Sequence, residues 1–98
     1  MAKISWTSEA ERWLKDIYDY IATDNPGAAA KIIAGIYEKA QLLSQFPEIG
    51  YRYDKYQNDE VCILLYGHYR IAYLVSADRD IDILGVFHGA LDMQRYLL

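Results

Sequence analysis

Residues 61–75, VCILLYGHYRIAYLV, predict the centre of the fold, because two apolar runs lie on either side of two turn-forming residues. Gly67-His68 has the length of the tight turn that joins neighbouring antiparallel strands. Runs of this length, rich in β-branched and aromatic residues, favour strands. We therefore expect a β-hairpin whose two strands are residues 61–66 and 69–75.

The second strand of this hairpin divides its polar and apolar side chains between two faces. Successive side chains of a strand point to opposite sides of the sheet. Arg70 is therefore expected on the face away from the core. There it either contacts a partner or nucleic acid, or it lies in solvent or pairs with an acid on a neighbouring strand. The core face is expected to hold Tyr69, Ile71, Tyr73 and Val75.

A third strand and a helical tail are predicted after the hairpin. The charged segment 76–80, SADRD, is short enough to link antiparallel neighbours, and the apolar run 81–87 follows it. Residues 90–98 have the apolar spacing of one or two final helical turns. One face of the third strand is expected to hold Ile81, Ile83 and Gly85.

The segment before the hairpin, residues 48–59, is polar and rich in tyrosine: EIGYRYDKYQND. Gly50 and Asn58 are residues that interrupt regular structure. No clear periodicity joins them, so we expect a long loop. Loops of this length in compact domains often carry function.

Two amphipathic helices are predicted before this loop. Ser8 is positioned to cap the first helix, and Glu11 three residues later completes a capping box. In the second helix, Asn25 suits the N-cap and Pro26 suits the first helical position. The apolar stripes consist of Ala10, Trp13, Leu14, Ile17 and Ile21 in the first helix and of Ala29, Ile33, Ile36, Ala40 and Leu43 in the second.

A short strand is expected over residues 3–6, and Phe46-Pro47 ends the second helix. The predicted order is therefore β-α-α-β-β-β-(α). This order indicates an α+β fold in which a helical hairpin packs on one face of a small, mainly antiparallel sheet. The 98 residues fit one domain, 1–98.

The composition narrows the functional classes. Hydrophobic residues make up 53% of the chain and charged residues 24%, and no targeting segment or membrane-length apolar run is visible, so a soluble cytoplasmic protein is expected. The net charge of −4 argues against direct nucleic-acid binding, which needs clustered Lys and Arg. The single cysteine, Cys62, permits no disulfide within the chain. No zinc, calcium or phosphate-loop motif is present, so neither a metal nor a cofactor is expected.

Five segments carry a resemblance to a known family. They are SWTSEAERWLKDIYDYIA, DNPGAAAKII, LSQFPEIGYR, YGHYRIAYLV and ILGVFHGALDMQRYL, and together they span nearly all of the chain. In their order and spacing, the sequence resembles the RelE/ParE superfamily of toxins from bacterial type II toxin–antitoxin pairs, nearer the ParE branch. The resemblance implies a compact toxin that a cognate antitoxin silences by wrapping around it.

The two branches of the superfamily imply different activities. ParE-like members resemble poisons of DNA gyrase with no established chemical step, whereas RelE-like members resemble ribosome-dependent mRNA endoribonucleases. RNA cleavage needs a base, an acid and cations for the charge that develops on phosphate. Few residues of this chain could supply these groups, which favours a protein-binding toxin over an enzyme. They are Arg52, Lys55, Arg70, His88, Arg95 and Tyr96.

Two departures from the ParE pattern open a third alternative. ParE-like toxins often carry arginine at the positions that Cys62 and Leu91 occupy here. Either this chain uses other residues, or it is attenuated, or it is a non-toxic member that keeps only antitoxin binding. Cys62 is expected to pack within its apolar strand. His88 is expected to be a structural residue at the junction of the last strand and the tail.

Tyrosine is the most unusual compositional feature, with ten in 98 residues. Its rigid, amphipathic ring favours protein contacts, but a tyrosine that only caps the core with its hydroxyl in water fits the pattern equally. The antitoxin is expected as an amphipathic segment in an apolar groove between the helical hairpin and the sheet. The expected antitoxin- or target-binding residues are Tyr51, Arg52, Tyr53, Tyr56, Arg70 and Arg95.

Overall fold

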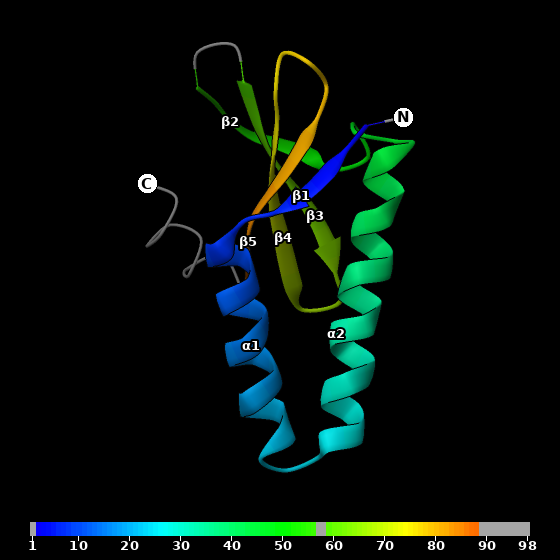
Figure 1. Ribbon diagram of the computed structural model, residues 1–98, viewed down its shortest axis with the longest axis vertical. Helices are drawn as coiled ribbons and strands as arrows, with labels where there is room; N and C mark the ends of the chain where they lie inside the picture. The colour runs from blue at the N-terminus through cyan, green and yellow to red at the C-terminus, as the bar shows by residue number, and fades with distance from the viewer. Residues whose placement is uncertain (1, 57–58, 89–98) are drawn as a thin grey trace.

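The computed structural model describes residues 2–56 and 59–88 (Figure 1). Within these ranges a helical hairpin packs on a five-stranded sheet, which confirms the predicted α+β class. Neither described helix has the length and apolar composition that a bilayer crossing demands. The elements, in chain order, are β1 (Ile4–Trp6), α1 (Ser8–Ala22), α2 (Pro26–Gln41), the short 3₁₀ helix η1 (Leu42–Ser44), β2 (Tyr51–Tyr56), β3 (Asp59–Tyr66), β4 (Tyr69–Val75) and β5 (Ile81–His88).

The sheet places the first strand of the chain beside the last. The strand order is β1-β5-β4-β3-β2, with β1 parallel to β5 and all other neighbours antiparallel. Ile4 lies opposite Ile81, whose backbone N–H donates to the carbonyl of Lys3 at 2.8 Å. The two helices run side by side and antiparallel, with α1 packed on β5 and α2 on β3 (Figure 1).

The central hairpin forms as predicted. Tyr66 and Tyr69 are paired across the two-residue turn, and Gly67 has a φ of 57° that suits glycine. Ile71 and Tyr73 are fully buried in the core between the sheet and the helices. Tyr69 packs at the margin of the same core, so the predicted inward face of β4 is confirmed.

The prediction of a long loop over residues 48–59 is wrong, because β2 occupies half of it. β2 lies at the edge of the sheet and pairs with β3, with Tyr51 opposite Ile63. The register shifts between Arg52 and Asp54, so Tyr53 is an extra residue in a bulge. Charged side chains and bulges are tolerated at an edge, where only one side needs a partner. The charged residues and the bulge interrupt the alternation of polar and apolar residues from which a strand is predicted.

The start of α1 is one residue earlier than the capping box predicted. Thr7 is the N-cap, and its hydroxyl accepts from the backbone N–H of Ala10 at 3.1 Å. The same hydroxyl donates to the carbonyl of Ile83 in β5 at 2.8 Å. Ser8 lies inside the helix instead, and Thr7 bonds both to the helix and to the sheet. The Asn25 cap of α2 is confirmed, with its side chain accepting from Ala28 at 3.0 Å.

The inward face of β5 also differs from the prediction. Ala72 pairs with Gly85 and Tyr73 with Ile83, so Leu84 is an extra residue that shifts the alternation. Val86 joins the core on the helix side, whereas Gly85 was predicted there. A bulge of this kind depends on the neighbouring strand, and strict alternation along one strand cannot reveal it.

The face of the sheet away from the helices carries a second, smaller cluster. Ile63, Ala72 and Phe87 are buried there, and Tyr53 and Leu84 pack against them. Trp13 of α1 reaches this cluster and meets Phe87 edge-on, with ring centroids 4.8 Å apart. The sheet therefore holds buried apolar side chains on both faces.

The hydroxyl of Tyr73 ties the segment before β2 to the centre of the sheet. It donates to the carbonyl of Pro47 at 2.9 Å and accepts from the N–H of Gly50 at 3.1 Å. Burial raises the pKa of Tyr73 well above its usual value, so the hydroxyl stays protonated. These two bonds fix the path by which the chain enters β2.

Candidate functional site

The sheet face away from the helices brings three of the predicted contact residues together. Arg70 of β4 reaches across β3, and its Nη1 donates to the Tyr51 hydroxyl at 3.4 Å. Tyr53 packs on the adjacent apolar cluster. Leu65, opposite Arg70 in the register, is 51% exposed. We call Tyr51, Tyr53, Leu65 and Arg70 the open-face patch.

Arg52 lies on the other side of the sheet from this patch. It pairs with Cys62, which belongs to the core beneath the helices. Arg52 and Cys62 line a recess of about 230 Å³ that also contains Arg79 and Glu48. Arg79 and Glu48 form an ion pair of 3.0 Å. Glu60 also lines the recess, so its two arginines are accompanied by two acids and it does not resemble a phosphate site.

Cys62 behaves as a packing residue. It is buried between β2 and β4, and its desolvation raises the pKa of the thiol. A raised pKa means less of the reactive thiolate at neutral pH. The prediction that Cys62 packs within its strand is therefore confirmed.

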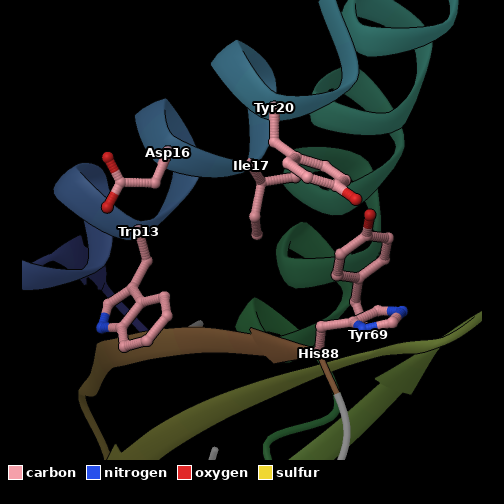
Figure 2. Close-up of a pocket in the computed structure, with 6 residues that line it drawn as sticks. All are labelled: Trp13, Asp16, Ile17, Tyr20, Tyr69 and His88. Carbon is pink, nitrogen blue, oxygen red and sulfur yellow. The ribbon is translucent and has the colours of Figure 1, made fainter.

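His88 belongs to a different surface, a cleft between α1 and the adjoining ends of β4 and β5 (Figure 2). The cleft has a volume of about 410 Å³. Four of its residues come from one side of α1 at helical spacings of three and four, and two come from paired positions of β4 and β5. The lining residues are Trp13, Asp16, Ile17, Tyr20, Tyr69 and His88.

Tyr69 lies beside His88 and Tyr20 in this cleft (Figure 2). The imidazole of His88 lies 5.3 Å from the ring of Tyr69, centroid to centroid, and 6.1 Å from that of His68. The hydroxyls of Tyr20 and Tyr69 point toward each other (Figure 2). Burial, followed by the nearby Tyr20, raises the pKa of Tyr69. The two tyrosines thus lie on the same side of the cleft.

The described residues around His88 do not form a proton-transfer dyad. A histidine that acts as a general base is oriented by a hydrogen-bonded partner. No hydrogen bond joins the His88 ring to a carboxylate among the described residues, although Asp16 lines the same cleft. Arg52 and Arg70 lie elsewhere. The described candidates for RNA cleavage are therefore not gathered at one point.

Several predicted residues cannot be placed. Arg95, Tyr96 and Leu91, together with the predicted tail helix, lie outside the described residues. Lys55 and Tyr56 belong to β2 by their backbone, but their side chains also fall outside the description.

Sequence reasoning missed most of the cleft. The signal available was the row of Trp13, Asp16 and Tyr20, which flanks the buried stripe of α1. Whether these three residues lie near Tyr69 and His88 depends on how α1 packs against the sheet. No local pattern gives that information.

The helical hairpin on one face of a five-stranded sheet defines the class of protein, the RelE/ParE-like toxin fold. The chain is similar to a chain of the chromosomal ParDE toxin–antitoxin system from P. aeruginosa, with a TM-score of 0.72 and 24% identity over 92% of this chain and 98% of that one. It is also similar to a chain of the RelBE2 toxin–antitoxin complex from Mycobacterium tuberculosis, with a TM-score of 0.63 and 23% identity over 90% and 98%.

Sequence comparison identifies the branch. Residues 4–93 match the family described as the ParE toxin of the type II toxin–antitoxin system parDE. Y4kP of Sinorhizobium fredii (strain NBRC 101917 / NGR234), a protein named as a candidate toxin, is 36% identical over 87 residues, which cover 89% of this chain and 88% of Y4kP. The chain therefore belongs to the ParE family of type II toxin–antitoxin toxins.

Proposed function

We propose that this toxin acts in the cytoplasm by binding and poisoning DNA gyrase, and that a cognate antitoxin neutralises it. The observation that supports this proposal over RNA cleavage is the separation of Arg52 and Arg70 by the sheet. Cleavage of RNA requires cations and proton-transfer groups that converge on one phosphate. Poisoning of a protein target requires a contact surface instead.

The open-face patch has the chemistry of such a surface. Tyrosine and arginine are enriched where proteins meet, and they dominate the binding energy of many interfaces. Tyr51 is 44% exposed and Leu65 is 51% exposed. The aromatic ring of the first and the aliphatic side chain of the second are therefore available to a partner. Arg70 lies opposite Leu65 and donates a hydrogen bond to the Tyr51 hydroxyl. We propose this patch as the contact for the target.

Replacing Arg70 with alanine should weaken the toxin without unfolding it. Expression of the unaltered chain alone should cause filamentation and DNA breaks. With purified protein and gyrase, Arg70→Ala should raise the concentration that inhibits supercoiling by about tenfold, as expected for the loss of one interface arginine. Arg79→Ala is the matched control, because Arg79 is also exposed but pairs with Glu48 away from the patch.

Each alternative predicts a different result in this experiment. Rapid cleavage of mRNA within translated codons would contradict the gyrase proposal and favour the ribonuclease. A folded chain with no effect on growth would favour the non-toxic alternative. Equal losses in Arg70→Ala and Arg79→Ala would argue against a specific role for the patch.

The antitoxin is proposed to cover the cleft between α1 and the sheet. This cleft matches the expected groove, with exposed aromatic rings and the aliphatic side chain of Ile17. We expect a neighbouring gene to encode a small protein with a DNA-binding N-terminal part and a helical tail. The tail would lay one side of an amphipathic helix along the cleft, with its apolar residues on the aromatic rings and Ile17.

Removal of one exposed ring should test this placement. Tyr20→Ala should weaken binding of the neighbouring gene product about tenfold by calorimetry, because an aromatic anchor at an interface commonly contributes more than 1 kcal/mol. Tyr18→Ala is the control, since Tyr18 is exposed on the same helix but does not line the cleft. Unchanged affinity in Tyr20→Ala would place the antitoxin elsewhere.

A further inference from the structure

The cleft of Trp13, Asp16, Ile17, Tyr20, Tyr69 and His88 combines aromatic faces with a carboxylate. The face of an aromatic ring carries negative potential that attracts a cation within about 6 Å of its centre. Asp16 adds a full negative charge to the same wall. Tyr20 is 84% exposed, so its ring remains available to a ligand (Figure 2).

The cleft has no cation of its own among the described residues that line it. Lys15 is next to Asp16 in the sequence, but its ammonium pairs with Asp19 at 2.9 Å and does not line the cleft. The whole chain carries a net charge of −4. Lys15 attracts Asp16 from outside the cleft, and the described residues of the lining itself add no Lys or Arg.

Next to Asp16, the lining disfavours an aliphatic side chain, even where the rest of the cleft is covered by apolar residues. Of the described residues that form the cleft, Ile17 alone is purely aliphatic. An aliphatic side chain would remove water from Asp16, His88 and the tyrosine hydroxyls without replacing their hydrogen bonds, which is costly. A flat cation can stack on the rings and still pair with the carboxylate.

We infer that this cleft binds a basic side chain of a partner protein, and that arginine is preferred. A planar guanidinium matches both aromatic faces and carboxylates, whereas an ammonium is a more strongly hydrated point charge. The inference rests on the proposed function only for the identity of the protein that supplies the side chain. The preference of the cleft for a cation is a property of the toxin alone.

The preference can be measured with two small probes of the same shape. Nα-acetyl-arginine methylamide and its neutral isostere Nα-acetyl-citrulline methylamide would be titrated into the full-length, isotope-labelled chain at pH 7.5. Resonances of Trp13, Tyr20 and Tyr69 should shift, and the arginine probe should bind roughly fivefold more tightly. Equal affinity, tighter binding of Nα-acetyl-leucine methylamide, or shifts confined to other surfaces would overturn the inference.

Two variants separate the charge from the ring. Asp16→Asn and Tyr20→Leu should each reduce the arginine-over-citrulline preference toward one, and both side chains are exposed, so the folded spectrum should persist. Glu38→Gln, an exposed acid on α2 outside the cleft, should keep the full preference. A preference retained in Asp16→Asn and Tyr20→Leu would overturn the inference. The gyrase assay has a separate readout, so its failure would not be confused with failure here.

Discussion

Phe87→Ala should lower the free energy of unfolding by about 3–5 kcal/mol, the range for truncation of a buried aromatic side chain. Phe87 is only 2% exposed, although it lies on the sheet face away from the helices. Its ring packs with Ile63 and Ala72 and receives the indole of Trp13 edge-on. Because small domains are stable by only about 5–15 kcal/mol, the loss should be visible as a large decrease in the denaturant midpoint by circular dichroism.

The chain contains one other phenylalanine, which provides the control. Phe46 follows η1 and is 53% exposed, so Phe46→Ala should change stability by no more than about 0.5 kcal/mol. Similar losses in Phe46→Ala and Phe87→Ala would contradict the assignment of a second core on this face of the sheet. A small loss of stability in both variants would also contradict that assignment.

Gly50→Ala should cost about 2–4 kcal/mol, from overpacking and a lost hydrogen bond. A methyl group at Gly50 would lie 2.5 Å from the backbone oxygen of Ile63 and 2.6 Å from the hydroxyl of Tyr73. The oxygen belongs to a central strand and cannot move aside. To make room, the segment must shift, and the bond from the Gly50 N–H to Tyr73 would be lost. Thermal and chemical unfolding would measure the loss.

The matched control is Gly27→Ala, because the same methyl group there meets only the side chain of Asn25 at 3.5 Å. Gly27 lies in the first turn of α2, where alanine is at least as favourable as glycine. Gly27→Ala should therefore be neutral or slightly stabilising. If Gly50→Ala were equally neutral, the close approach of Gly50 to Tyr73 would not constrain this segment.

The sequence contained enough information for the elements with strong local signals. The hairpin around Gly67, the cap at Asn25 and the inward face of β4 all depend on residues that are close in the chain. The edge strand β2 was missed because it pairs with β3 alone. An edge strand tolerates charged residues and a bulge, so its sequence lacks the regular alternation of a strand. The bulge at Leu84 was missed because it is defined by the register with β4.

The candidate site was predicted less completely for the same reason. The approach of Tyr51 to Arg70 and the separation of Arg52 from both follow from the register of three strands. A list of polar residues along the sequence cannot show which of them share a face. The cleft around Tyr69 additionally requires the packing of α1 on the sheet, which is a tertiary property.

The parallel pairing of β1 with β5 has a consequence for synthesis of the toxin on the ribosome. The backbone N–H of Lys3 donates to the side chain of Asp80, 77 residues later in the chain. β1 therefore cannot join the sheet until β5, the last described strand, has been synthesised. The helical hairpin depends on contacts between residues that are closer in the chain, so it can form earlier. A nascent chain halted before Ile81 lacks the strand that positions both β1 and Thr7. The cleft between α1 and the sheet, which includes His88 at the end of β5, is thus completed only when nearly the whole chain has been synthesised.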